Sequence, residues 1–112
     1  MIKGIGLDLV ELARIEKMML RSKRFIERIL TEKEQQIFET LSHARKVEFL
    51  AGRFAAKEAY SKANGTGIGK DCELQQIEIL KDEIGKPVLY FDGELVNGFI
   101  SITHTKTTAA AQ

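Results

Sequence analysis

The stretch HARKVEFLAGRFAAKEAYSKA, residues 43–63, decides the fold of this 112-residue chain. Its apolar residues recur at three- and four-residue spacing, which predicts the longest helix of the chain. The residues of this apolar stripe are Val47, Leu50, Ala51 and Phe54. The only weak point inside the pattern is Gly52, whereas Asn64-Gly65 is a normal helix stop. We therefore expect one long helix that the rest of the chain packs around.

Shorter elements flank this helix on both sides. Before it we expect one buried strand and three helices, over residues 2–10, 11–20, 22–30 and 31–41. After it we expect two strands, a short helix and a final hairpin, over residues 74–80, 87–91, 94–97 and 99–111. This order predicts an α+β fold, with a long helix packed on a mostly antiparallel sheet. Because Ala111-Gln112 stops in mid-pattern, we also expect a shortened C-terminal strand.

Composition is typical of a soluble globular protein, with 44% hydrophobic and 29% charged residues. The length favours a single domain over residues 1–112, and its small core favours an oligomer. Cys72 is the only cysteine, so an internal disulfide is excluded. No apolar run approaches the roughly 20 residues of a membrane span. We expect a cytoplasmic protein that does not enter the membrane.

Two acidic residues occupy positions that suit neither a strand interior nor an apolar helix face. Asp8 interrupts the first apolar strand, and Glu58 continues the apolar stripe of the long helix. Lys62 follows Glu58 by one helical turn, so the two could simply form an exposed pair. Alternatively, the carboxylates sit at the edge of the core and hold magnesium, with Arg53 and Lys57 supplying cations for a phosphate-rich ligand. Spacing alone leaves both interpretations open.

The glycine run Gly65-Thr66-Gly67-Ile68-Gly69-Lys70 follows the long helix. Glycines permit positive φ and a close approach of backbone amides to phosphate oxygens. However, a phosphate-binding P-loop opens a helix and has Ser or Thr after its lysine, and this run meets neither condition. A plain helix-to-strand connection is the alternative. His104, in a polar turn, is open to a catalytic role or to none.

A basic stripe covers the two helices expected before residue 30. Its members are Arg14, Lys17, Arg21, Lys23, Arg24 and Arg28. Such a stripe is compatible with an ordinary solvated face or with docking of an acidic protein. Nucleic-acid binding is disfavoured, because aromatic residues other than Phe25 are missing and the net charge is only +1.

Several motifs resemble those of bacterial holo-[acyl-carrier-protein] synthases, which are 4′-phosphopantetheinyl transferases. Residues 4–11, GIGLDLVE, are similar to the opening of that family, and residues 49–62, FLAGRFAAKEAYSK, are similar to its signature helix. The loop GTGIG at 65–69, GKP at 85–87 and ISITHT at 100–105 follow in the order of the family. The resemblance covers nearly the whole chain.

The resemblance implies a homotrimer with active sites at subunit interfaces. It implies that Asp8 and Glu58 hold magnesium against the pyrophosphate of coenzyme A, with Glu58, Lys62 and Asp8 as catalytic residues. The residues implied to contact coenzyme A are Arg45, Arg53, Lys62, Gly65, Thr66, Gly67, Lys86, Pro87, His104 and Thr105. The side chains implied to dock an acyl carrier protein are Arg14, Arg21 and Arg24.

The implied reaction moves the 4′-phosphopantetheine arm of coenzyme A onto a serine of apo acyl carrier protein, for fatty acid biosynthesis, and releases 3′,5′-ADP. Two alternatives from other classes remain at this point. One is a different phosphate-transfer or nucleotide-hydrolysing enzyme, whose turnover would need no protein acceptor. The other is a non-catalytic adaptor that binds an acidic partner through the stripe from Arg14 to Arg28 and needs no magnesium.

Overall fold

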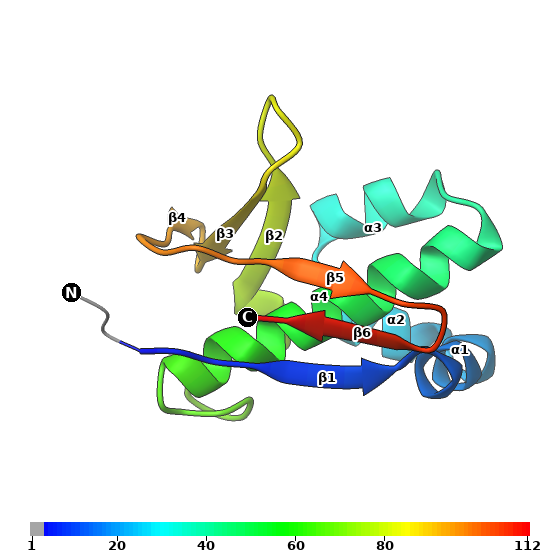
Figure 1. Cartoon of the computed structure of the whole chain (residues 1–112), viewed down its shortest axis with the longest axis horizontal. Helices are drawn as coiled ribbons and strands as arrows, with labels where there is room; N and C mark the ends of the chain where they lie inside the picture. Colours follow the sequence, from blue (N-terminus) through cyan, green and yellow to red (C-terminus); the bar gives the residue numbers. More distant parts are fainter. Residues whose placement is uncertain (1–3) are drawn as a thin grey trace.

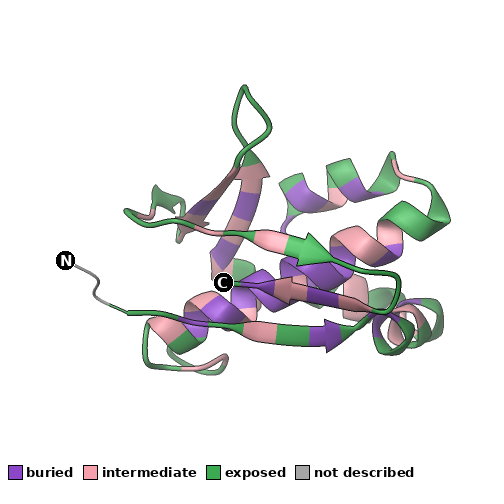
Figure 2. Cartoon of the chain, in the orientation of Figure 1, coloured by how far each residue is buried: buried purple, intermediate pink, exposed green. Residues whose placement is uncertain are grey.

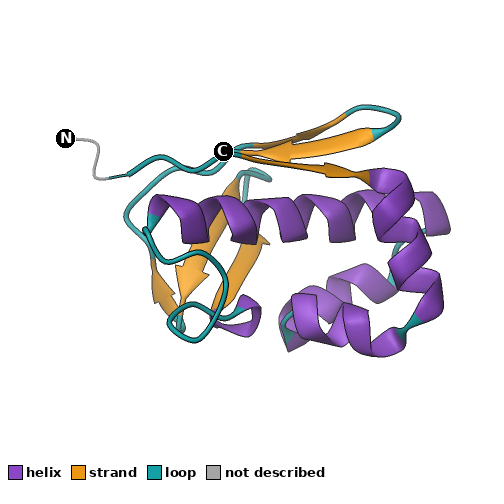
Figure 3. Ribbon diagram, turned by 90° about the horizontal axis from the view of Figure 1, so that it is seen from below, coloured by secondary structure: helices purple, strands orange, loops and turns teal. Residues whose placement is uncertain are grey.

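Helix α4 (His43–Ala63) forms the centre of the structure, a computed structural model that describes residues 4–112. Ser42 caps its first turn, where the side-chain oxygen accepts a hydrogen bond from the Arg45 amide. The helix ends where the Asn64 amide donates to the carbonyl oxygen of Tyr60 at 2.8 Å. Figures 1 and 3 show the other elements arranged around α4. The predicted long helix is confirmed.

Two three-stranded antiparallel sheets pack against α4. The first has the order β1–β6–β5 and consists of β1 (Asp8–Glu11), β6 (Thr108–Ala111) and β5 (Ile102–His104). The second has the order β2–β3–β4 and consists of β2 (Ile77–Lys81), β3 (Pro87–Phe91) and β4 (Glu94–Leu95). Figure 3 shows the first sheet on one side of α4 and the second crossing it on the other. The predicted α+β class is confirmed, but the strands form two sheets.

Strand β6 occupies the centre of the first sheet. It pairs with β1 along its whole length, from Thr108 opposite Glu11 to Ala111 opposite Asp8, and with β5 on its other edge. Strand β6, which we had expected to be shortened, therefore joins β1 and β5 in one sheet.

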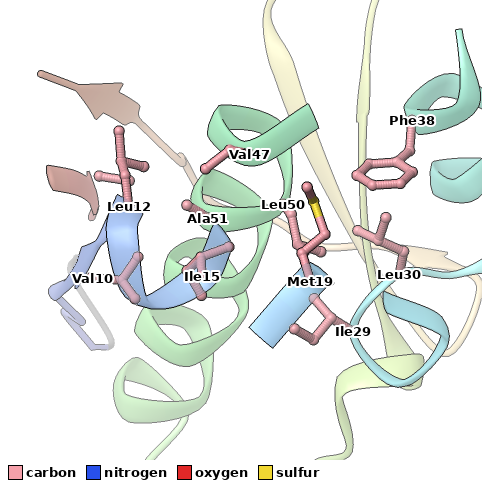
Figure 4. Close-up of a cluster of buried hydrophobic side chains, with 11 residues drawn as sticks. Val10, Leu12, Ile15, Met19, Ile29, Leu30, Phe38, Val47, Leu50 and Ala51 are labelled. Carbon is pink, nitrogen blue, oxygen red and sulfur yellow. The ribbon is translucent and has the colours of Figure 1, made fainter. Parts of the chain in front are cut away.

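Three short helices connect β1 to α4: α1 (Leu12–Arg21), α2 (Lys23–Ile29) and α3 (Glu32–Glu39). The predicted capping box at the start of α3 is present, with the Thr31 and Glu34 side chains each accepting from the other residue's amide. Apolar side chains from α1, α2 and α3 meet those of α4 in the larger core cluster (Figure 4). Its labelled members are Val10, Leu12, Ile15, Met19, Ile29, Leu30, Phe38, Val47, Leu50 and Ala51.

Small residues let the two sheets approach α4 closely. Ala55, Ala56 and Ala59 are almost completely buried against Ile77 and Ile79 of β2 in the second core cluster. Figure 2 shows this buried interior of α4, in contrast to the exposed surfaces of α1 and α2. Among the described residues, no helix is long and apolar enough to cross a membrane.

Three predicted elements differ from the structure. The first strand begins at Asp8, because Gly4 and Gly6 run as irregular chain against α4, and the expected residues 2 and 3 lie outside the described range. Leu74–Gln76 form one turn of 3₁₀ helix (η1), so the strand begins only at Ile77. The expected helix at 94–97 is wrong, because Asp92 and Gly93 both have positive φ and join β3 directly to β4.

Candidate active site

Asp8 reaches the C-terminal half of α4 because two glycines precede it. The chain at Gly6 runs so close to α4 that a Cβ atom there would lie 1.7 Å from the carbonyl oxygen of Ala59. At Gly4 it would lie 2.2 Å from the carbonyl oxygen of Ala63. A side chain at either position would push this segment away from the helix. The two glycines therefore place β1, and Asp8 with it, beside α4.

Asp8 pairs with Lys62 of α4. The Lys62 ammonium donates to Asp8 Oδ1 at 2.8 Å and to the Leu7 carbonyl oxygen at 3.2 Å. This hydrogen bond to Asp8 raises the pKa of Lys62, so the ammonium remains charged. In the described part of the chain Lys62 thus pairs with Asp8 and forms no close ion pair with Glu58, which the helical spacing had allowed.

Glu58 lies one turn before Lys62 and is partly buried. Burial raises the pKa of Glu58, the charge of Asp8 raises it further, and Lys62 opposes both effects. The influence of Asp8 places the two carboxylates in one electrostatic neighbourhood, although they are far apart in the sequence. This repulsion between acidic side chains is a feature that a bound cation relieves.

The donor set fits magnesium. Residues 4–112 contain no group of three or more His, Cys, Asp or Glu side chains that could enclose a metal ion. Magnesium, however, is usually held by only one or two carboxylates and completes its shell with water and phosphate oxygens. Asp8 and Glu58 supply that number of ligands and carry the excess negative charge. They suit a cation that is shared with a phosphate-bearing substrate.

A cavity of about 470 Å³ opens beside the N-terminal half of α4. Its lining combines α4 with β5 and the turn before β3, including Pro87. The basic side chains and the imidazole on its wall are Arg45, Arg53, Lys81 and His104. Gly52 keeps α4 close to β5, since a Cβ atom there would lie 3.0 Å from Ile102 Cγ2. The cavity therefore offers positive charge to an anionic ligand.

Arg53 is the most deeply buried cation of this cavity, with 6% of its surface exposed. Its guanidinium lies 4.2 Å from the centre of the Phe49 ring. Arg53 Nε has no hydrogen-bond partner among the described residues. Burial lowers the pKa of Arg53 while the charge of Glu34 opposes that shift, and an arginine stays protonated under either influence. A buried donor without a partner is costly, and the positive charge of Arg53 on the cavity wall favours an anion there.

Three residues that we expected to contact coenzyme A use their backbone amides in hydrogen bonds at the end of α4. The amide of Gly65 donates to the Lys62 carbonyl, and the amides of Thr66 and Gly67 both donate to the Ser61 carbonyl at 3.1 Å. Gly65 and Gly67 have positive φ, as a helix-ending turn requires. In this structure the end of α4 engages these three amides, and their contact with coenzyme A phosphates stays a prediction. The plain helix-to-strand connection is what we observe.

Two further expected contacts are involved in local interactions. Thr105 Oγ1 accepts from the Thr107 and Thr108 amides and closes the β5–β6 turn. Lys86 Nζ lies 5.1 Å from the centre of the Phe99 ring, at the rim of the molecule. Gly85 and Pro87 of the GKP segment line the cavity, and so do Thr103 and His104 of the ISITHT segment.

Lys57 is not available to a ligand, which corrects our expectation. Its ammonium is fully buried and donates to Glu34 Oε1 at 2.6 Å and to the carbonyl oxygens of Ile29 and Leu74. Glu34 Oε2 in turn accepts from the Ile79 amide at 2.8 Å. This pair ties α4 to α3, β2 and the end of α2. The sequence carried no sign of it, since the two residues are 23 positions apart.

Comparison with known proteins agrees with these observations. Residues 4–111 match the 4′-phosphopantetheinyl transferase superfamily. The chain is 60% identical, over its whole length and 93% of the relative's, to the holo-[acyl-carrier-protein] synthase of Bacillus velezensis. The chain belongs to the 4′-phosphopantetheinyl transferase superfamily.

Solved structures of this superfamily share the fold of our chain. The holo-(acyl-carrier-protein) synthase of Bacillus anthracis, in complex with CoA (3′,5′-ADP), superimposes with a TM-score of 0.87 at 50% identity, over 99% of our chain and 93% of the other. The Helicobacter pylori holo-[acyl-carrier-protein] synthase, in complex with coenzyme A, gives 0.83 at 34% identity, over 96% and 95% of the two chains. The resemblance found in the sequence is confirmed.

The basic stripe of this superfamily member lies on the surface of α1 and α2. All of its cationic residues are exposed, including Arg14, Arg21 and Arg24. Leu20 stands among them with 70% of its surface exposed. The opposite side of α1 is buried in the core through Leu12, Ile15 and Met19. The basic residues of the stripe are therefore exposed to solvent and do not take part in the protein's own core.

Proposed function

We propose that this protein is a magnesium-dependent holo-[acyl-carrier-protein] synthase, with residues 1–112 as one catalytic domain. It transfers the 4′-phosphopantetheine group of coenzyme A to a serine of apo acyl carrier protein and releases 3′,5′-ADP. The observation that carries this proposal is that one helix, α4, contributes Glu58 and Lys62 to the cluster with Asp8 and also lines the cavity with its basic side chains. The names of the superfamily relatives agree with this substrate pair.

In the proposed reaction the serine hydroxyl attacks the phosphorus atom next to pantetheine, and the bond to the bridging oxygen breaks. Glu58 accepts the proton of the hydroxyl, a role that its raised pKa suits. Lys62 leaves Asp8 and stabilises the phosphate that departs. Magnesium held by Asp8 and Glu58 would supply charge neutralisation at the pyrophosphate.

The cavity residues bind the nucleotide in this proposal. Arg53 offers a buried donor that has no partner in the described chain, and Arg45 and His104 lie at the same cavity. Pro87 and Lys86 bound the turn beside it, while Gly65, Thr66, Gly67 and Thr105 shape loops around the substrate. The roles of these residues rest on their placement and on the family.

The spacing along α4 supports a site shared between subunits. Arg45 and Glu58 are 13 residues apart, which corresponds to about 20 Å along a helix. Only a ribose ring separates the 5′-diphosphate of coenzyme A from its 3′-phosphate, which is a much shorter distance. We propose that the two clusters act on one coenzyme A when they come from two chains of a homotrimer.

An apolar sheet face gives such a trimer a place to form. Leu7 and Leu9, before and within β1, have 55% and 65% of their surfaces exposed. Leu9 is opposite Ala110 in β6, and Ala110 is opposite Thr103 in β5, so small residues continue this face. Exposed apolar surface of this kind marks an interaction site. We place the subunit interface at the outer face of the β1–β6–β5 sheet.

The carrier protein docks on the basic stripe in this proposal, through Arg14, Arg21 and Arg24. A cytoplasmic location is part of the same proposal. The adaptor hypothesis would also use the stripe, but it gives no reason for the partnerless Arg53.

The test is whether release of 3′,5′-ADP from coenzyme A requires apo carrier protein. Release in the presence of the carrier and none in its absence supports the proposal. Release without any protein acceptor would identify a nucleotide hydrolase instead. No release under either condition, from a folded sample with magnesium, would favour the adaptor.

A further inference from the structure

Glu48 stands out in the cavity because of its charge. Among the described residues that line the cavity, it is the one that carries a carboxylate. It lies on α4 between Arg45 and Arg53, and 31% of its side chain is exposed. An acidic side chain on the wall of an anion site opposes the binding of the anion. The proposed transfer reaction does not explain why a carboxylate lies on this wall.

Arg45 and His104 both lie near the carboxylate of Glu48. Arg45 Nη1 lies 3.8 Å from Glu48 Oε1, and His104 Nε2 lies 3.5 Å from the same oxygen. These are ion-pair distances without the geometry of short hydrogen bonds. The contrast with the buried Lys57–Glu34 pair, at 2.6 Å, is large. Weak, partly exposed pairs exchange partners at little cost.

A phosphate in this cavity would use the same two side chains, the Arg45 guanidinium and the His104 imidazole. Each one that turns toward the ligand gives up its interaction with Glu48, and the carboxylate then faces a like charge. Arg53 differs, because its Nε has no partner to give up among the described residues. The cavity thus combines one cation whose Nε has no hydrogen-bond partner with two basic side chains that a carboxylate already engages.

We propose that Glu48 is a built-in competitor of the nucleotide phosphate, which weakens binding at Arg45 and His104 and speeds the release of 3′,5′-ADP. This inference rests on the proposed function and adds a residue that sets affinity at its nucleotide site. An alternative role for Glu48 is to hold Arg45 and His104 in place for the ligand. The two roles make opposite predictions for the loss of its charge.

The test is isothermal titration of the protein with 3′,5′-ADP, without carrier or metal, for the wild type, Glu48→Gln and Glu39→Gln. The amide keeps the size of Glu48 and one acceptor oxygen but removes its charge. Glu39 is the matched control, because this α3 carboxylate pairs with Lys46 at 4.0 Å outside the cavity lining. We expect Glu48→Gln to bind about tenfold more tightly, the effect of one like charge near the ligand, and Glu39→Gln to match the wild type.

Steady-state kinetics provides a second measurement. Glu48→Gln should lower the inhibition constant of 3′,5′-ADP by a similar factor and should lower kcat wherever product release limits turnover. Unchanged or weaker binding by Glu48→Gln overturns the inference, as does an equal gain in Glu39→Gln. Binding of 3′,5′-ADP by a wild-type protein that transfers nothing would refute the proposed function, while the titration would still decide the role of Glu48. No binding by either protein overturns the inference.

Discussion

The carboxylate of Asp8 and the ammonium of Lys62 lie 2.8 Å apart although 54 residues separate them in the chain. Lys62 thus occupies the position of a counter-ion to Asp8, next to a Glu58 whose pKa is raised. We expect a cation that binds Asp8 and Glu58 to compete with Lys62 for Asp8, so that Lys62 becomes free for the substrate phosphate. In the proposed mechanism this exchange would link metal binding to the placement of Lys62.

Replacing Glu58 by Gln should abolish catalysis without loss of stability. Because burial and the charge of Asp8 disfavour the ionised form, Glu58 contributes less to stability as the pH rises above the ordinary range of a carboxyl. We expect kcat to fall about a hundredfold or more. The melting temperature at neutral pH should equal or exceed that of the wild type.

Added magnesium should change the melting temperatures of the wild type and of Glu58→Gln by different amounts. The melting temperature of the wild type should rise with added magnesium, and that of Glu58→Gln should rise much less. Near-normal turnover of Glu58→Gln at saturating magnesium would show that this residue is not the base.

Replacing Gly6 by Ala should move Asp8 away from α4. The new Cβ atom would lie 1.7 Å from the Ala59 carbonyl oxygen, so the segment must shift, and a shift of about 1 Å can cost a hundredfold in rate. Gly69→Ala is the control, since its Cβ atom would meet nothing within 4 Å and its φ is not positive. Equal turnover of the two variants, measured at saturating magnesium, would contradict this account.

The Lys57–Glu34 pair should be essential for stability. Glu34→Gln leaves a buried ammonium without its counter-charge, and we expect a loss of about 3–5 kcal/mol in the free energy of unfolding. Burial lowers the pKa of Lys57, and loss of Glu34 lowers it further. The folded state then binds fewer protons than the unfolded state, so the loss should shrink as the pH rises.

Chemical denaturation at several pH values checks this expectation. The double variant Lys57→Met/Glu34→Met should be more stable than either single variant, because neither charge is then left alone. A loss that does not depend on pH would mean that Lys57 is not the source of the penalty.

Replacing Leu9 by Glu should separate the subunits. Leu9 is 65% exposed in the single chain, and a charge there would be buried in the proposed interface. Light scattering should give a trimer for the wild type and a monomer for Leu9→Glu, which should also lose turnover. Ile84→Glu, at an 86% exposed turn position, should remain trimeric. A trimeric Leu9→Glu variant would place the interface elsewhere.

Neutralising Arg14, Arg21 and Arg24 together should weaken carrier binding alone. Their exposed charges steer an acidic partner and do not reach the Asp8–Glu58 cluster. We expect KM for the carrier to rise roughly tenfold, the equivalent of about 1.4 kcal/mol, with kcat and KM for coenzyme A unchanged. The same assay on Lys33→Ala, an exposed lysine of α3, provides the control. An unaltered carrier KM would exclude the stripe as the docking surface.

Local sequence signals predicted most of the fold. The spacing of Val47, Leu50 and Ala51 predicted α4, and the Thr31 and Glu34 pair predicted the start of α3. Local patterns were misread at Asp92-Gly93. This dipeptide lies between two apolar runs and is a hairpin signal, but we had expected a helix at residues 94–97. Local patterns failed at Gly4 and Gly6 too, because their close approach to α4 is a tertiary contact that alternation of apolar residues does not reveal.

The site was predictable only as far as residue type and family motifs allow. Asp8 was suspicious because a strand interior rarely holds an unpaired acid, and Lys62 is indeed its partner. Lys57 and Glu48 show the limit, since two charged residues of the same helix lie in opposite environments, one inside the core and one at a cavity. Which partner a charge meets depends on segments that are distant in the sequence, and helical spacing does not specify them.

The most direct test of the central claim is intact-mass spectrometry of apo acyl carrier protein after incubation with this protein, coenzyme A and magnesium. The account predicts a mass gain of one 4′-phosphopantetheine group, which is lost with EDTA, with Glu58→Gln, or when the acceptor serine of the carrier is replaced by alanine. No mass gain on a carrier that another transferase can modify, with a folded and assembled protein, would contradict it.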